Sequence, residues 1–172
     1  MNKKIAVIGC PGAGKTTFAI KLGKALCLPV VHLDKTYHDS TRWSKDLGEK
    51  RIAWREHVVK LAAQSRWIID GNYRSTFQER FKQADLIIFL DYPARISLYR
   101  AFKRLFKHHK VLRPDMPETW REHISWHFFL FILKYNITIR KEVYSYLEQE
   151  SEEKVTVLRS PKQATEYLKS LA

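Results

Sequence analysis

The stretch Gly9-Cys10-Pro11-Gly12-Ala13-Gly14-Lys15-Thr16 decides the fold, because it matches G-x-x-x-x-G-K-[ST] at every fixed position. An apolar run over residues 4–8 precedes it and predicts a buried strand, and residues 15–27 have the pattern of a helix. Glycines let such a loop wrap with its backbone N–H groups pointing inward, and the helix N-terminus adds positive partial charge. The stretch therefore predicts a P-loop, which cradles the phosphates of a nucleoside triphosphate.

The side chains of this loop have expected roles of their own. Lys15 is expected to bridge the β- and γ-phosphates, and the Thr16 hydroxyl is expected to bind Mg²⁺. Cys10 is interpreted as a tolerated small residue rather than a redox centre. The sequence has no legible base-reading motif, so ATP and GTP both remain open. The full set expected to bind the nucleotide here is Gly9, Pro11, Gly12, Ala13, Gly14, Lys15, Thr16 and Thr17.

Strands and helices alternate from this loop to the end of the chain. Short apolar runs predict four more strands, at residues 30–33, 67–70, 86–90 and 154–158. Helical spacing of apolar residues predicts helices at 49–64, 94–108, 118–149 and 161–171. This alternation is typical of an α/β fold with a parallel sheet. No linker interrupts it, so we expect one domain over residues 1–172, which is long enough for a buried core.

The composition limits the class of protein and its surroundings. Two cysteines, Cys10 and Cys27, without C-x-x-C spacing argue against a disulfide scaffold or a zinc site and predict a cytoplasmic protein. The longest apolar stretch, residues 124–133, is far shorter than the roughly 20 residues that span a bilayer, so we expect no membrane insertion. The net charge of +13 predicts an anionic partner, either a nucleotide, a nucleic acid or an acidic surface.

Two strings resemble the adenylate kinase-like nucleoside and nucleotide kinases. Residues 9–17 read G-x-P-G-x-G-K-T-T, as at the start of those enzymes, and residues 70–74 lie where they carry D-G-x-P-R, with Tyr73 in place of the proline. The resemblance implies a three-layer α/β/α sandwich of the P-loop NTPase class, with a five-stranded parallel sheet and a small lid. It also implies that Asp70 helps to hold Mg²⁺ through water. It implies a substrate site that includes Asp70, Gly71 and Arg74, with the arginine binding an acceptor phosphate.

Further strings cover nearly the whole chain and resemble the bacterial DNA topology modulation proteins, also called FlaR-like, which are related to adenylate kinase. The family label implies an effect on DNA topology, whereas the sequence pattern of the family implies a small-molecule kinase. The strings are His32-Leu33-Asp34, Trp67-Ile68-Ile69-Asp70-Gly71-Asn72-Tyr73, Leu90-Asp91-Tyr92-Pro93, Arg113-Pro114-Asp115-Met116 and Val157-Leu158-Arg159-Ser160.

Two aspartates follow predicted strands, at the edge of the sheet where α/β proteins bind ligands. Asp34 is expected to end the second strand and to accept or orient a substrate hydroxyl, with a capping role as the structural alternative. If the acceptor is a phosphate, Asp34 only positions it. Asp91 precedes Tyr92-Pro93, so a turn role and a ligand contact are equally expected.

The basic helix at 94–108 carries Arg100 and Arg104 one turn apart, which resembles the lid arginines of adenylate kinase-like enzymes. There, such arginines neutralise the transferring phosphoryl group, so both are catalytic candidates, with a lid over about residues 105–118 and Arg113 beside them. The alternative is a solvated cationic face. By positional analogy, Arg159 is expected to contact the nucleotide base.

The helix at 118–149 has a second apolar strip, Trp126, Phe129, Leu130 and Leu133, for which we expect burial rather than a dimer contact. The chain is therefore expected to be a monomer or a homodimer.

The sequence is compatible with two functions. The first is an ATP- and Mg²⁺-dependent phosphotransferase acting on a nucleoside, a nucleotide or a similar small acceptor. The second is a nucleic-acid-associated ATPase or DNA-binding protein, suggested by the net charge of +13 and the basic helix. The sequence has no nucleic-acid-reading motif, which places this second function behind the first.

Overall fold

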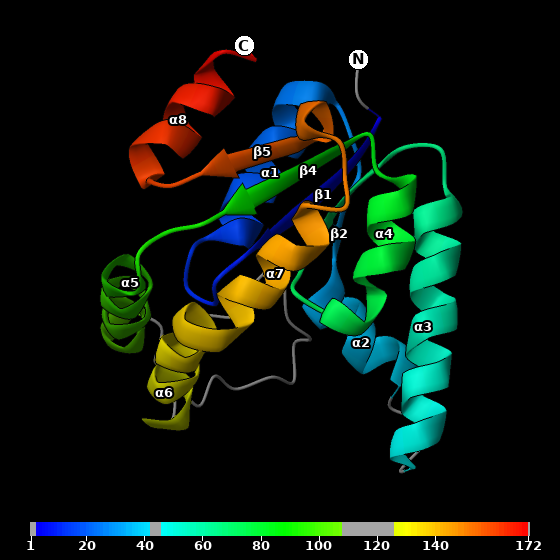
Figure 1. Cartoon of the computed structure of the whole chain (residues 1–172), viewed down its shortest axis with the longest axis horizontal. Helices are drawn as coiled ribbons and strands as arrows, with labels where there is room; N and C mark the ends of the chain where they lie inside the picture. Colours follow the sequence, from blue (N-terminus) through cyan, green and yellow to red (C-terminus); the bar gives the residue numbers. More distant parts are fainter. Residues whose placement is uncertain (1–2, 42–45, 108–125, 172) are drawn as a thin grey trace.

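A computed structural model describes residues 3–41, 46–107 and 126–171, and its centre is a five-stranded sheet (Figure 1). The strands lie in the order β2-β3-β1-β4-β5, and every neighbouring pair is parallel. Their bounds are β1 Lys4–Gly9, β2 Val30–His32, β3 Trp67–Asp70, β4 Leu86–Leu90 and β5 Val155–Leu158. Because the strands are parallel, their carboxyl ends meet at one edge, where the P-loop and the 70–74 string both begin.

Helices cover both faces of this sheet. The helix α1 packs against β1, β2 and β3 and also against α8, while α3 and α4 pack together and α4 contacts β1. Figure 1 shows α7 in front of the sheet and α1 behind it. The helices are α1 Lys15–Leu26, α2 Leu33–Thr41, α3 Leu47–Ala63, α4 Phe77–Gln83, α5 Ala94–Lys107, α6 Trp126–Lys134, α7 Arg140–Leu147 and α8 Pro161–Lys169. Shorter turns are the 3₁₀ helices η1 Arg74–Thr76 and η3 Glu152–Lys154 and the π-helical turn η2 Tyr135–Ile139.

The core lies on both faces of the central strands. The apolar residues of β1 from Ile5 to Ile8 are fully buried, and so are Ile87, Ile88 and Phe89 of β4. A strand with both faces covered has no solvent side, so it needs a continuous apolar run rather than alternation. The three-layer fold with five parallel strands predicted from the sequence is therefore confirmed.

The structure contains two helices that the sequence pattern did not predict, α2 and α4. The expectation that Asp34 ends the second strand is wrong, because β2 ends at His32 and Asp34 lies in the first turn of α2. That helix is rich in weak helix formers, and it is stabilised by packing, since Leu33 is fully buried and Tyr37 packs edge-on against Trp54 at 5.1 Å.

The helix predicted over residues 118–149 corresponds to α6, η2 and α7, and its first residues lie outside the described part of the chain. The expected burial of its second strip is wrong for Leu130 and Leu133, which are 48% and 42% exposed, because this helix turns Ile132 and Tyr135 into the core instead. The Trp126 side chain is outside the described residues. Among the described helices, none has the length and apolar character needed to cross a membrane.

Candidate active site

The P-loop connects β1 to α1 and fits tightly against α5. Gly12 has a φ of +83°, and a Cβ there would lie 2.8 Å from the Ser97 carbonyl oxygen. A substituent at this position would therefore meet both backbone strain and a clash, which explains the glycine. The loop is closed by a backbone hydrogen bond from Ala13 N–H to the Cys10 carbonyl, with an N···O distance of 3.0 Å.

The Lys15 ammonium folds back over its own loop. Its Nζ donates hydrogen bonds to the carbonyl oxygens of Gly9, at 3.1 Å, and of Cys10, at 3.4 Å. Both acceptors belong to the cradle, so the charge already lies beside the space that the loop encloses. The Cys10 side chain is buried, and burial raises the pKa of its thiol. A protonated thiol agrees with the interpretation of Cys10 as a tolerated small residue.

Asn72 fixes the start of the P-loop from the neighbouring strand. Its Oδ1 accepts a hydrogen bond from Gly9 N–H at 3.0 Å, and its Nδ2 donates one to the Gly9 carbonyl. Sequence reasoning gave Asn72 no role, although an amide directly after a strand that pairs with β1 was the available signal. The side chain acts as a two-point clamp between the 70–74 string and the phosphate cradle.

Arg80 organises the same string from inside the protein, and sequence reasoning missed it as well. It is fully buried on α4, and it donates to the carbonyl oxygens of Gly71, at 3.0 Å, and Tyr73, at 3.2 Å. Its guanidinium also lies over the Phe77 ring, 5.1 Å from the centroid. Burial lowers the pKa of Arg80 to about 9, which leaves it charged at neutral pH. Gly71 itself has a φ of +142°, and a Cβ there would lie 2.8 Å from Leu33.

The predicted metal ligands suit Mg²⁺ by their chemistry, a hydroxyl oxygen and a carboxylate. Thr16 lines the main cavity of the protein, whereas Asp70 is 3% exposed at the end of β3 and lies 2.7 Å from His32 Nδ1 through its Oδ2. Asp70 therefore has one oxygen held by an imidazole, which the sequence did not indicate. Within the described residues, no group of three or more His, Cys, Asp or Glu side chains gathers as a metal site.

One cavity of about 790 Å³ joins the phosphate cradle to a second region. The cradle part is lined by the P-loop, by α1 and by Pro161 and Ala164 of α8. The other part, called here the α7 part, is lined by residues of α2, of the β3–α4 connection and of η2 and α7. These residues are Asp34, Asn72, Tyr73, Arg74, Phe77, Tyr135, Ile139 and Val143. The predicted residues Pro11, Gly12, Ala13, Gly14, Lys15, Thr16, Thr17, Asp34, Arg74 and Arg100 all line this cavity.

In the α7 part, Asp34 lies near an aromatic side chain, Tyr73. Burial, together with the nearby Asp34 carboxylate, raises the pKa of Tyr73. The Tyr73 ring packs against Trp54 at 4.7 Å and against Tyr37 at 5.3 Å between centroids. The tyrosine that replaces the expected proline therefore lines the same cavity as a predicted site residue, Asp34.

The arginines of the site differ in their surroundings. Arg74 lines the α7 part and is paired with Glu142 of α7. Arg100 donates to the Ala13 carbonyl oxygen at 2.5 Å and lies over the Tyr92 ring, 5.5 Å from its centroid, so it contacts the P-loop directly. The Arg104 side chain and Arg113, and with them most of the lid segment, lie outside the described residues.

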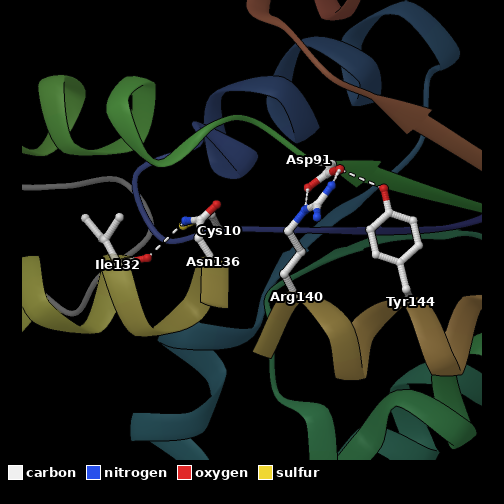
Figure 2. A network of polar contacts seen from close by, with 6 residues as sticks. All are labelled: Cys10, Asp91, Ile132, Asn136, Arg140 and Tyr144. Carbon is white, nitrogen blue, oxygen red and sulfur yellow. Dashed lines mark hydrogen bonds and ion pairs between the residues drawn. The ribbon is translucent and has the colours of Figure 1, made fainter. Parts of the chain in front are cut away.

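Asp91 and Arg159 lie beside a second, smaller hollow of about 250 Å³ and do not line the main cavity. Figure 2 shows Arg140 reaching Asp91, with Nε–Oδ1 and Nη2–Oδ2 distances of 2.6 and 2.8 Å, and the Tyr144 hydroxyl 2.7 Å from Oδ2. Burial alone would raise the pKa of Asp91, but these hydrogen bonds lower it overall. Asp91 therefore joins the end of β4 to α7, which favours a structural role, while a ligand contact by Asp91 and base contact by Arg159 stay predictions.

Neither a protein-family profile nor a curated protein matches this sequence. Solved structures are similar in fold. Shikimate kinase from Bacteroides thetaiotaomicron superposes with a TM-score of 0.61 at 17% identity, covering 99% of this chain and 97% of that chain. Shikimate kinase from Acinetobacter baumannii in complex with shikimate gives a TM-score of 0.58 at 17% identity, covering 98% of this chain and 90% of that chain. At this identity the likeness shows the fold, a P-loop α/β fold shared with these kinases.

Proposed function

We propose that this protein is a P-loop kinase that transfers the γ-phosphate of ATP to a small acceptor. The observation that supports this most strongly is the single cavity, in which a complete phosphate cradle opens into a region with its own carboxylate, Asp34. A nucleotide in the cradle would present its terminal phosphate to a molecule in the α7 part. A binding protein or a simple ATPase has no need of this second region.

The expected roles follow from position. Backbone N–H groups of the P-loop and the start of α1 bind the phosphates, and Lys15 exchanges the Gly9 and Cys10 carbonyls for phosphate oxygens. Arg100, already on the loop at Ala13, neutralises charge on the phosphoryl group as it transfers. Thr16 would hold Mg²⁺ directly and Asp70 through water, and the metal would supply neutralisation of the phosphate charge. The fold neighbours are shikimate kinases, which agrees with a kinase function.

The test is an acceptor screen with purified protein, Mg²⁺ and ATP. The panel contains nucleosides, their 5′-monophosphates, shikimate and its methyl ester, and duplex DNA, and both ADP and phosphorylated product are measured. Acceptor-dependent product that disappears in Lys15→Ala, with the variant still folded by circular dichroism, is the expected result. Undiminished turnover in Lys15→Ala contradicts the proposal.

The DNA arm of the panel separates the kinase from a nucleic-acid-associated ATPase. If duplex DNA alone stimulates ADP release, and its binding weakens steeply with salt, the protein is an ATPase acting on nucleic acid. We expect weak DNA binding from the charge of +13 and no stimulation of ADP release. GTP is tested in parallel, because the sequence has no legible base-reading motif.

A further inference from the structure

One buried hydroxyl in the wall of the main cavity has no partner among the described residues. Tyr135 is 2% exposed and lines the cavity, and its hydroxyl oxygen is buried without a hydrogen bond to any of them. A buried hydroxyl that has lost its water and gained no partner raises the free energy of the folded state, so folded proteins rarely contain one. Burial also raises the pKa of Tyr135, so this hydroxyl keeps its proton and is able to donate a hydrogen bond.

Packing accounts for the Tyr135 ring and not for its oxygen. The buried side chains of α6, η2 and α7 are Ile132, Tyr135, Ile139, Val143 and Leu147. All of these except Tyr135 are aliphatic, so this side of the helix is apolar apart from one oxygen atom. A phenylalanine would fill the same space without burying an unpaired polar group. The oxygen therefore has a purpose other than packing.

The place of Tyr135 distinguishes it from other unpaired groups. In the part of the chain that the structure describes, the buried side-chain atoms without a partner also include Trp54 Nε1, His57 Nε2, Glu79 Oε2 and Ser97 Oγ. None of these four residues lines the main cavity. Tyr135 does, so it adjoins a space of about 790 Å³ in which a ligand can supply the missing partner.

The turn that carries Tyr135 is anchored at both ends. Tyr135 begins the π-helical turn η2, and the next residue, Asn136, contacts the Cys10 sulfur at 3.5 Å. Directly after the turn, Arg140 binds Asp91 through both of its oxygens (Figure 2). Turns of this kind are rare and often occur at functional sites. The backbone of η2 is therefore held in the position that leaves the hydroxyl unpaired.

We propose that the Tyr135 hydroxyl binds the phosphate acceptor, by donating a hydrogen bond to one of its oxygen atoms. The inference rests on the proposed kinase function and adds to it a residue that selects the acceptor. Tyr135 belongs to the α7 part of the cavity, whereas the phosphates of ATP are expected in the P-loop part, so the acceptor supplies the partner. A buried hydroxyl that regains a partner only in the complex discriminates against molecules that cannot accept its hydrogen bond.

Thermal unfolding of the free protein tests whether the hydroxyl is unpaired. Tyr135→Phe removes only the oxygen, and its Tm is expected to equal or exceed that of wild type. Tyr144→Phe is the matched contrast, because the Tyr144 hydroxyl lies 2.7 Å from Asp91 Oδ2. Its Tm is expected to fall by roughly 2–4 °C, the shift for one lost hydrogen bond in a domain of this size. A similar fall in Tyr135→Phe would mean that its hydroxyl already has a partner, and would overturn the inference.

Kinetics of Tyr135→Phe identify the ligand that the hydroxyl binds. The probes are those nucleosides, 5′-monophosphates or shikimate compounds of the panel that the wild-type protein phosphorylates. We expect kcat/KM for the acceptor to fall about 5-fold to 10-fold, the loss for one hydrogen bond, with the KM for ATP unchanged. Tyr99→Phe, at an exposed tyrosine on α5, is the control and is expected to behave as wild type.

Two outcomes separate the inference from the function on which it rests. Wild-type kcat/KM for the acceptor in Tyr135→Phe, or a change confined to the KM for ATP, overturns the inference while the kinase function stands. If no member of the panel yields a phosphorylated product, the proposed function fails and the inference fails with it.

Discussion

Single polar side chains between the strands decide how firmly the phosphate cradle is held, and Asn72 is the clearest of them. It makes two hydrogen bonds to the backbone of Gly9, and a loop that loses both is less ordered before the nucleotide arrives. We expect Asn72→Ala to weaken ATP binding by up to about 30-fold, since each of the two hydrogen bonds contributes roughly 1 kcal/mol. Calorimetric titration with ATP measures this, with Gln64→Ala, at an exposed position after α3, as the control. Wild-type affinity in Asn72→Ala would show that the clamp has no part in binding.

Arg80 is a second residue that supports the site, because it binds the backbone of the 70–74 string from the buried side. Replacing it with Met keeps much of the apolar contact with Phe77 but leaves the carbonyl oxygens of Gly71 and Tyr73 without their donor. We expect Arg80→Met to lower the free energy of unfolding by roughly 2–4 kcal/mol, because buried acceptors lose their partners. Urea denaturation measures the change. Arg51→Met, at an exposed position of α3, should change stability by less than about 0.5 kcal/mol, and equal losses in the two variants would refute this explanation.

The sequence could predict residues that act through a fixed local motif, and it could not predict those that act across the fold. Lys15 and Thr16 follow from eight consecutive letters, and the structure puts both at the main cavity. Asn72 and Arg80 bind partners 63 and 9 residues away, and their type alone gives no sign of it. Tyr73 was noticed only as a departure from a proline, although it lines the cavity and its ring packs against Trp54 and Tyr37.

Helices and strands show the same contrast: the sequence pattern predicts some of them, and others form only because they pack against the rest of the protein. Every predicted strand was found, because strands covered on both faces are continuous apolar runs in the sequence. The helix α2 was missed because Asp, Thr and Ser dominate it, and its stability comes from Leu33 and Tyr37 against the rest of the protein. The helix α4 has seven residues, too few for helical spacing to be distinguished from a loop. Short elements that flank the site are therefore where the prediction was incomplete.

The tie between β4 and α7 gives a prediction about pH. The hydrogen bonds from Arg140 and Tyr144 lower the pKa of Asp91 against the opposing effect of burial. A carboxylate whose pKa is lower in the folded state adds stability above its unfolded pKa of about 4, and this stability is lost as the pH falls through the folded pKa. We expect Asp91→Asn to be about 2 kcal/mol less stable than wild type at pH 7, with the difference shrinking below pH 4.

Urea denaturation of both proteins at pH 7, 5, 4 and 3 measures this difference directly. Because the other carboxylates titrate alike in the two proteins, their contributions cancel in the comparison. A difference between wild type and Asp91→Asn that stays constant down to pH 3 would mean that Asp91 is not charged and paired in the folded protein.

On the scale of the whole molecule, the main cavity is built from residues far apart in the chain. The P-loop and α1 come from its start, Tyr92 and Arg100 from its middle, and Pro161 and Ala164 from α8 near its end. A ligand that contacts all of these segments binds the folded chain and not the unfolded one. Its binding energy therefore adds to the stability of the entire domain.

Thermal unfolding with and without Mg²⁺ and ATP tests this coupling. If residues 1–172 form a single domain, unfolding is one cooperative transition, and ATP at 100 times its Kd stabilises it by about 2.7 kcal/mol. For a domain of this size, that corresponds to a rise in Tm of roughly 5–10 °C. Lys15→Ala, which loses the phosphate contact, should show little of this rise at the same ATP concentration. An equal rise in Lys15→Ala would mean that ATP binds elsewhere, and two separate transitions would mean that part of the chain folds independently of the cavity.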